Sequence, residues 1–188
     1  LDSRDAMIDG QLVKDGNVTN YYSKAGETLV GKAVPDWMGG LTNTFTYKNF
    51  DLSFMISFQT GAKMFDYTGY FLRYSDGVRV GSFNMEQEVA GNYWKQPGDV
   101  VEHPKPIYSN PYRSDKFSSR TLVSTDNVRM REITLGYRVP ISKKYISNLR
   151  VFFKANNPFM IYNAAGSIDP DVDTNGYRQT DTPPTKSF

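Results

Sequence analysis

The sequence predicts an all-β chain that contributes strands and long loops to a transmembrane antiparallel β-barrel. Three observations support this fold class: a composition that favours strands and turns, segments in which apolar and polar residues alternate, and connections that are short and long in turn. The 188 residues include 13 Tyr and 12 Phe, which favour strands, and 15 Gly and 10 Pro, which favour turns.

The first alternating segments predict a β-hairpin of the barrel wall over residues 39–60. They follow residues 1–38, which lack periodic apolar positions and are interpreted as an extracellular loop. A first strand, LTNTFTY, leads through a short break at Lys48 and Asn49 into a second strand. On one face of this second strand apolar residues occupy every second position, namely Leu52, Phe54, Ile56 and Phe58.

Residues 61–127 are interpreted as a long extracellular loop, because Gly, Pro and Ser interrupt them throughout. An irregular segment of this length is unusual in a compact soluble domain. Aromatic rings offer large amphipathic surfaces to sugars or to a partner protein. The candidates for such contacts are Tyr93, Trp94, Tyr108 and Tyr112. Packing within the loop is the alternative role for all four.

A second hairpin of the barrel wall is predicted over residues 128–159. In VRMREITLGYRVP, apolar residues alternate with polar ones until Pro140 ends the strand. The next strand, LRVFFKANN, alternates in the same way, and Pro158 is expected to end it. We assign Asn156, Asn157 and Pro158 the structural role of strand termination. Residues 160–188 are interpreted as a further extracellular loop.

The connection lengths alternate strictly along the chain. Residues 48–49 and 140–148 are short connections, whereas 1–38, 61–127 and 160–185 are long. An outer-membrane barrel has tight periplasmic turns, long outside loops, and strands that are apolar outward and polar inward. The expected lipid-facing residues are Leu52, Phe54, Ile56, Phe58, Ile133, Leu135 and Tyr137. The expected lumen-facing residues, which either pair across the wall or contact a plug or water, are Glu132, Arg138, Arg150 and Lys154.

Three separated segments resemble the C-terminal region of the SusC/RagA-type TonB-linked outer-membrane proteins of Bacteroidetes. They are PDWMGGLTNTFTYKNFDLSFMISFQTG, VRMREITLGYRVP, and LRVFFKANNPFMI followed by IDPDV. The resemblance covers most of residues 35–188, in matching order and spacing. Family members end with one more strand after a Thr-Pro-Pro-like segment, so we expect the last strand to be missing from these residues.

The resemblance implies a multi-pass outer-membrane barrel of about 22 strands with an N-terminal plug. It also implies import of a large nutrient, either an oligosaccharide or a peptide, with energy relayed by TonB. A SusD-like surface lipoprotein would act as the lid. The plug and the TonB-contacting region are expected to lie outside this chain, which would supply barrel wall and outside loops.

Metal and catalytic chemistry find little support in the sequence. Asp169, Asp171 and Asp173 have the alternate spacing of calcium ligands but lack the glycine and distal glutamate of an EF-hand loop. His103 lies in the stiff segment EHPKP and is interpreted as a solvated loop residue rather than a catalytic base. The chain has no Cys. We therefore expect no enzyme activity and no cofactor.

Charge and alternative functions complete the prediction. The 22 basic and 20 acidic residues are scattered, which gives no reason to expect nucleic acid as a partner. A soluble β-rich carbohydrate-binding module remains an alternative, with the exposed aromatic residues as its sugar platform. A passive porin is a second alternative, because its strands would show the same pattern. A hydrolase is a third, although no spacing fixes two carboxylates on one surface.

Overall fold

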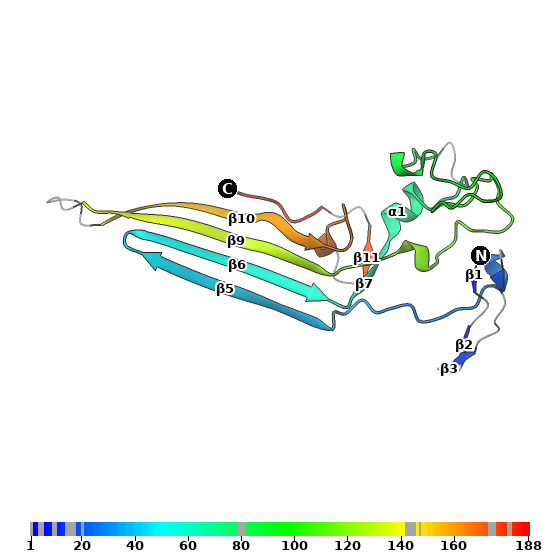
Figure 1. The fold of residues 1–188 in the computed structure, drawn as a ribbon, viewed down its shortest axis with the longest axis horizontal. Helices are drawn as coiled ribbons and strands as arrows, with labels where there is room; N and C mark the ends of the chain where they lie inside the picture. The colour runs from blue at the N-terminus through cyan, green and yellow to red at the C-terminus, as the bar shows by residue number, and fades with distance from the viewer. Residues whose placement is uncertain are drawn as a thin grey trace. The chain divides into compact units, whose positions relative to one another are not determined.

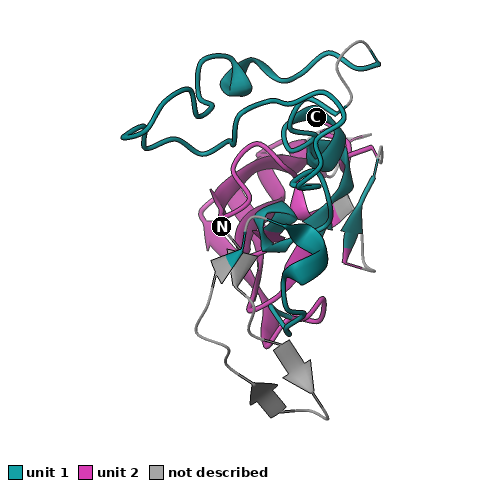
Figure 2. Cartoon of the chain, turned by 90° about the vertical axis from the view of Figure 1, so that its right-hand side faces the viewer, with its two compact units in different colours: residues 1–31, 65–122, 177–180 teal, residues 32–64, 123–176, 181–188 magenta. Residues whose placement is uncertain are grey.

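The computed structural model describes residues 21–78, 82–141, 146, 148–172, 176–179 and 182–188, and the backbone of short stretches at 2–3, 6–8, 11–13 and 18–19. The chain forms two compact units (Figure 2). Unit 1 comprises residues 1–31, 65–122 and 177–180, and unit 2 comprises residues 32–64, 123–176 and 181–188. Two of the boundaries between the units fall within short strands, β7 (Lys63–Asp66) and β8 (Leu122–Ser124).

Unit 2 is built on a four-stranded antiparallel sheet in the order β10-β9-β6-β5 (Figure 1). The strands are β5 (Trp37–Tyr47), β6 (Phe50–Thr60), β9 (Asn127–Val139) and β10 (Leu149–Asn163), with 11, 11, 13 and 15 residues. A tilted strand needs about 9–11 residues to cross a bilayer. The structure therefore confirms the all-β prediction with strands of transmembrane length.

The register of this sheet sorts its residues into an apolar and a polar face. One row across the four strands contains Phe45, Leu52, Leu135 and Phe153, each paired with the next. The adjacent row, on the other face, contains Thr44, Ser53, Thr134 and Lys154. Successive residues of a strand point to opposite faces, so the rows alternate along the whole sheet.

Short and long connections leave the sheet at opposite ends. Tyr47 pairs with Phe50, so Lys48 and Asn49 form a two-residue turn, in which Lys48 has a φ of 54°. Val139 pairs with Leu149 at this same end, because Phe50 also pairs with Tyr137. At the opposite end of the sheet, Gln59 of β6 pairs with Asn127 of β9. The long segment between β6 and β9 leaves and returns at this end.

Bulges in β9 and β10 change the predicted end of the last strand. The pairing of β6 with β9 skips Arg131, and the pairing of β9 with β10 skips Asn157 and Pro158. The prediction that Pro158 ends its strand is wrong, since β10 continues to Asn163. A bulge residue needs no ladder hydrogen bond, so it tolerates proline and the φ of 47° at Asn157.

Unit 1 contains short elements where the sequence suggested irregular loops. Two antiparallel pairs lie near the N-terminus: β1 (Asp2–Ser3) with β4 (Val18–Thr19), and β2 (Ala6–Ile8) with β3 (Gln11–Val13). Further along are the helix α1 (Tyr67–Leu72) and the 3-10 turns η1 (Tyr22–Lys24), η2 (Gln87–Val89) and η3 (Ser119–Thr121). β11 (Tyr177–Arg178) pairs in parallel with Phe65 and Asp66 of β7. A last 3-10 turn, η4 (Pro170–Val172), belongs to unit 2.

An aromatic cluster and a buried carboxylate hold unit 1 together. The ring of Phe65 lies 4.9 Å from that of Phe117 and 5.0 Å from that of Tyr177. Asp66 is fully buried and accepts a hydrogen bond of 3.0 Å from the backbone N–H of Gly69, at the start of α1. It also pairs with the guanidinium groups of Arg73 and Arg178. Among the described residues, no helix has the length and apolarity needed to span a membrane.

Candidate functional site

The polar face of the sheet carries two ion pairs, and three of the four residues in them were expected to face the lumen. Arg150 Nε donates to Asp51 Oδ1 at 3.1 Å, which joins β10 to β6 across the central strand β9. Lys154 Nζ lies 2.9 Å from Glu132 Oε2. Pairing across the wall, one of the two roles considered for these charges, is therefore present in the structure for Glu132, Arg150 and Lys154.

A glycine leaves room for the pair of Arg150 and Asp51. Asp51 and Arg150 lie on either side of Gly136, which pairs with Asp51 on β6 and with Phe152 on β10. A Cβ at Gly136 would lie 2.5 Å from Arg150 Nη2 and 2.6 Å from Asp51 Oδ1. The absent side chain thus leaves the space in which the two charged groups meet.

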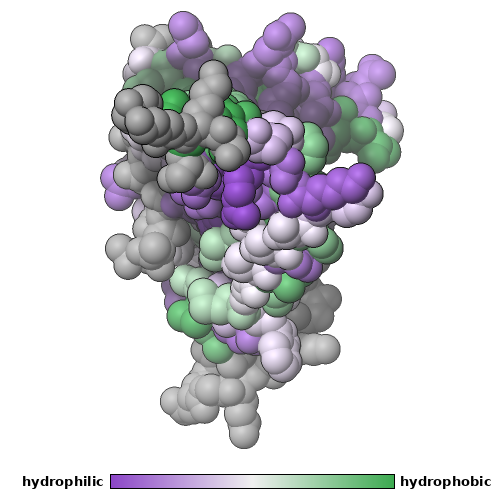
Figure 3. Space-filling view, turned by 90° about the vertical axis from the view of Figure 1, so that its left-hand side faces the viewer, coloured by the Kyte–Doolittle hydropathy of each residue, from purple (hydrophilic) through white to green (hydrophobic). Residues whose placement is uncertain are grey.

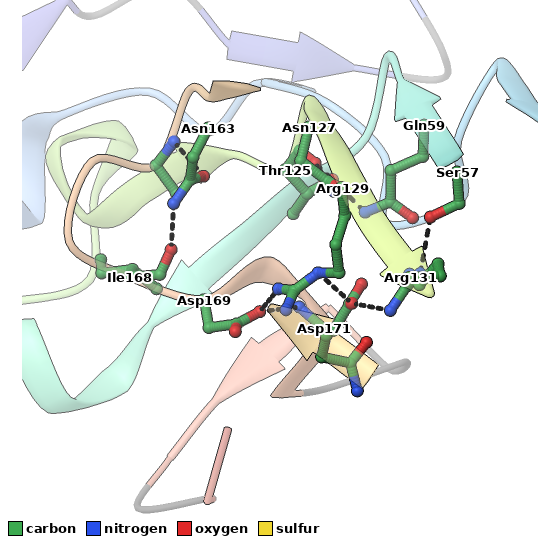
Figure 4. Close-up of polar contacts among 12 residues, drawn as sticks. Ser57, Gln59, Thr125, Asn127, Arg129, Arg131, Asn163, Ile168, Asp169 and Asp171 are labelled. Carbon is green, nitrogen blue, oxygen red and sulfur yellow. Dashed lines mark hydrogen bonds and ion pairs between the residues drawn. The ribbon is translucent and has the colours of Figure 1, made fainter. Parts of the chain in front are cut away.

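A second charge cluster ties the segment after β10 to β9 (Figure 4). Arg129 is buried, with 5% of its side chain exposed, and pairs with Asp169 and Asp171. Arg131, the bulged residue, reaches Asp171 Oδ2 at 2.5 Å and Ser57 Oγ at 2.6 Å. The bulge therefore adds a second arginine to the polar face beside Arg129.

This cluster includes two of the three candidate metal ligands, Asp169 and Asp171. The two described carboxylates, Asp169 and Asp171, are both engaged by arginine, and Asp173 lies outside the described residues. No group of three or more metal-ligating side chains occurs among the residues that the structure describes. The amide of Asn163 donates to the backbone oxygen atoms of Gly166 and Ile168, which adds to the fixation of this segment.

The apolar face of the sheet is uncovered. In the row described above, Phe45, Leu135 and Phe153 are 54%, 48% and 53% exposed. In Figure 3 hydrophobic side chains (green) lie at the molecular surface beside hydrophilic ones (purple). The expected lipid-facing residues of β6 and β9 all lie on this face, because Leu52 pairs with Leu135, Phe54 with Ile133, and Phe50 with Tyr137. Soluble monomers rarely expose apolar surface of this extent.

Unit 1 contains a cavity of about 700 Å³. Its aromatic lining residues are Tyr22, Trp94 and Tyr112. Its ionisable lining residues besides tyrosine are Glu102, His103, Lys105, Lys116 and Arg120. Cavities of 300–1,000 Å³ that combine apolar walls with a few polar groups are typical of small-molecule sites.

The candidate contact residues divide between this cavity and its surroundings. Trp94 and Tyr112 line the large cavity, and Tyr93 lines a neighbouring cavity of about 280 Å³. Tyr108 is 81% exposed and lines neither. The structure thus brings two of the four aromatic residues together around one space.

His103 is a correction to the sequence prediction. It is 2% exposed rather than solvated, and it lines both cavities. Its backbone makes a strand-like bridge to Tyr93, with a hydrogen bond of 2.9 Å from Trp94 N–H to its carbonyl oxygen. Among the described residues, neither of its ring nitrogen atoms has a hydrogen-bond partner. The residue is buried beside both cavities, which the rigid Pro-rich sequence did not indicate.

A buried ion pair lies beside His103. Arg120 donates through Nη1 and Nη2 to the two carboxylate oxygen atoms of Asp76, at 3.0 and 3.2 Å. Burial raises the pKa of Asp76, and the guanidinium of Arg120 opposes this. The ring of Tyr74 lies 5.7 Å from that of His103 and 5.0 Å from the guanidinium carbon of Arg120.

Sequence reasoning missed most of the groups in these clusters. Asp76, Arg120 and Arg129 carried no local signal, because their partners are about 40 residues away in the chain. Gly136 could have been found, since a glycine inside a strand often marks a close approach of other groups.

The comparisons with known proteins agree with the geometry of the sheet. No protein-family model matches the chain. The TonB-dependent receptor P39 of Formosa agariphila is 27% identical over 154 residues, which are 79% of this chain and 14% of that protein. The TonB-dependent receptor P3 of the same organism is 24% identical over 90% of this chain and 16% of its own length. The chain therefore spans about one sixth of these relatives.

Solved structures show the same fold. The RagAB peptide importer in its closed-closed state matches 96% of this chain and 19% of its own chain, with a TM-score of 0.72 and 19% identity. The RagAB peptide transporter matches 84% of this chain and 17% of its own, with a TM-score of 0.68 and 19% identity. The fold of this chain thus matches that of less than one fifth of each solved chain.

Proposed function

We propose that the chain is part of a SusC/RagA-type TonB-dependent receptor of the outer membrane, and that it forms part of the wall and outside loops of a nutrient importer; its likeness to TonB-dependent receptors and to the fold of a peptide importer supports this. The observation that carries the proposal is the uncovered apolar face of four antiparallel strands, each long enough to cross a bilayer. An opposite face with ion pairs is what an aqueous lumen or a plug requires.

Under this proposal the two faces of the sheet have different surroundings. The row of Phe45, Leu52, Leu135 and Phe153 contacts lipid. The pairs Arg150–Asp51 and Lys154–Glu132 face the interior of the barrel. The two-residue turn and the connection over 140–148 lie in the periplasm, and the longer segments lie outside the cell.

The cargo is a peptide or an oligosaccharide, and a SusD-like surface lipoprotein covers the barrel. The resemblance to SusC/RagA proteins supports this lid, and the name of the solved peptide importer supports a peptide cargo. Energy comes from TonB through parts of the protein outside these 188 residues. A passive porin remains the second candidate, because its wall would have the same two faces.

Deletion of the gene in its host tests import. We expect the mutant to lose growth on one class of nutrient, either a peptide mixture or an oligosaccharide mixture, and to regain it when the full gene is restored. Depletion of TonB in the wild type should cause the same loss. Growth that depends on the gene but not on TonB would favour the porin. Unchanged growth on all nutrients tested would contradict both.

Fractionation tests the location independently of transport. The full-length protein should be enriched in the outer membrane, and protease added to intact cells should cleave within residues 82–121. A protein found in the soluble fraction would favour the carbohydrate-binding module instead.

A further inference from the structure

We propose that the large cavity of unit 1 binds a carboxylate carried by the imported nutrient, with Lys105 and Lys116 as its cationic contacts. The proposal rests on the proposed import function, because it names a chemical group of the cargo. The reasons are the charge balance of the cavity and its aromatic walls.

The charge balance of the lining favours an anion. Lys105, Lys116 and Arg120 are basic, and Glu102 is the single acidic residue of the lining. The charge of Arg120 is already compensated by Asp76, which contacts it through both carboxylate oxygen atoms. Within the described part of the chain, neither lysine forms an ion pair with a carboxylate. Two ammonium groups are therefore available to a ligand against one carboxylate.

The type of donor favours a carboxylate over a phosphate. Phosphate groups are commonly recognised by a bidentate arginine or by a nest of backbone N–H groups. The only arginine of the lining is engaged with Asp76. Lysine acts as a point charge and can compensate a singly charged group. A single carboxylate therefore suits the charges that remain free.

The walls suit the body of such a ligand. Trp94 and Tyr112 line the same cavity as the two lysines, and aromatic faces pack against sugar rings and against flat or apolar peptide side chains. A uronic acid and the C-terminus of a peptide both combine a carboxylate with such a body. The test below separates these two sources.

Binding is measured on the full-length receptor purified from its outer membrane, by titration calorimetry. One pair of probes is a uronic-acid trisaccharide and its methyl ester, and the other is a tripeptide and its C-terminal amide. We expect one of the two acids to bind at least about tenfold more tightly than its neutral counterpart, as the loss of a charge-assisted contact implies. The acid that binds identifies the source of the carboxylate.

Variants connect this preference to the cavity. Lys105→Ala combined with Lys116→Ala should remove the preference. Lys95→Ala is the matched control, since Lys95 belongs to the same unit, lies over the ring of Tyr93 and lines neither cavity. Equal binding of acid and neutral probes, no binding of either acid, or an unchanged preference in the double variant would each overturn the proposal.

Growth assays of the same variants separate this proposal from that of import. If the double variant loses the preference while the wild type supports growth on the nutrient, both proposals stand. If the wild type supports growth but binds acid and neutral probes equally, the carboxylate site fails and import remains. If purified wild type shows the preference and deletion of the gene leaves growth unchanged, import fails and the site remains.

Discussion

Arg150 of β10 and Asp51 of β6 meet across the central strand β9, directly over the Cα of Gly136. The two charged residues are 99 positions apart in the chain. The strand between them has no side chain at this point, because the residue there is Gly136. The contact therefore links three strands, and it depends on a glycine at one position of the polar face.

A Gly136→Ala variant tests this dependence. The added Cβ should displace the two side chains and break their pair, while alanine stabilises a strand by roughly 0.5–1 kcal/mol relative to glycine. We expect little net change in the thermal unfolding of the full-length barrel. The informative measurement is the double-mutant cycle of Asp51→Asn and Arg150→Gln, whose coupling should be present in wild type and absent in Gly136→Ala. Equal coupling in both backgrounds would show that the pair does not need the glycine.

The two faces of β6 are expected to differ in their reactivity with thiol reagents. The chain has no Cys, so single cysteines can be introduced as probes. Cysteine at Ser53, on the polar face, should react with a membrane-impermeant maleimide. Cysteine at Phe54, one residue later, should react slowly, because lipid keeps the thiol protonated and excludes the reagent. Comparable rates at both positions, in intact outer membranes, would contradict the assignment of Phe54 to a lipid-facing side.

The division of the strand residues between two faces could be predicted because alternation is a local property of the sequence. Leu52 and Phe54 are two residues apart in one strand and therefore share a face, and their pairing with Leu135 and Ile133 extends this face to β9. Fold class and the residues that share a face could therefore be predicted from the sequence. Which face contacts lipid stays a prediction.

The contacts of the loops could not be predicted from the sequence, since they join residues that are far apart in the chain. Asp66 is buried against Arg178, which lies 112 residues later, and the predicted loop gave no sign that its carboxylate would anchor α1. The continuation of β10 past Pro158 depended on a bulge whose position is set by pairing with β9. The prediction for His103 was wrong for the same reason, because its buried ring lies 5.7 Å from that of Tyr74, which is distant in the chain.

Loss of the two carboxylates that pair with Arg129 should release the segment after β10. Removing the partners of a buried charge costs about 3–5 kcal/mol. Asp169→Asn combined with Asp171→Asn should therefore increase hydrogen exchange across residues 164–171 and lower the unfolding temperature. Arg131→Gln is the milder comparison, since Arg131 is 32% exposed and leaves Arg129 paired. A double variant with unchanged exchange would show that Asn163 and the local turns suffice to hold the segment.

Calcium is expected to have no effect at this cluster. Asp169 and Asp171 already contact arginine, and a cation placed between them would have to displace or repel two guanidinium groups. We therefore expect the unfolding temperature of the wild-type protein to be the same in calcium and in chelator. A rise with calcium that disappears in the Asp169→Asn, Asp171→Asn variant would revive the metal hypothesis.

The turn over residues 95–99 should depend on pH through Asp99. The backbone N–H groups of Lys95 and Gln96 both donate to Asp99 Oδ2 at 2.9 Å, and these bonds lower the pKa of Asp99. A carboxyl group whose pKa is lower in the folded state stabilises the fold above its unfolded pKa, and this contribution is lost as the pH falls through the folded value. Protection of the two amides from hydrogen exchange should thus be constant at pH 5 and above, and should decrease below the ordinary range of aspartate. Asp99→Asn, which keeps an acceptor oxygen but no charge, should lose this pH dependence while retaining partial protection. A wild-type protection profile that matches the variant at every pH would mean that the charge of Asp99 does not hold the turn.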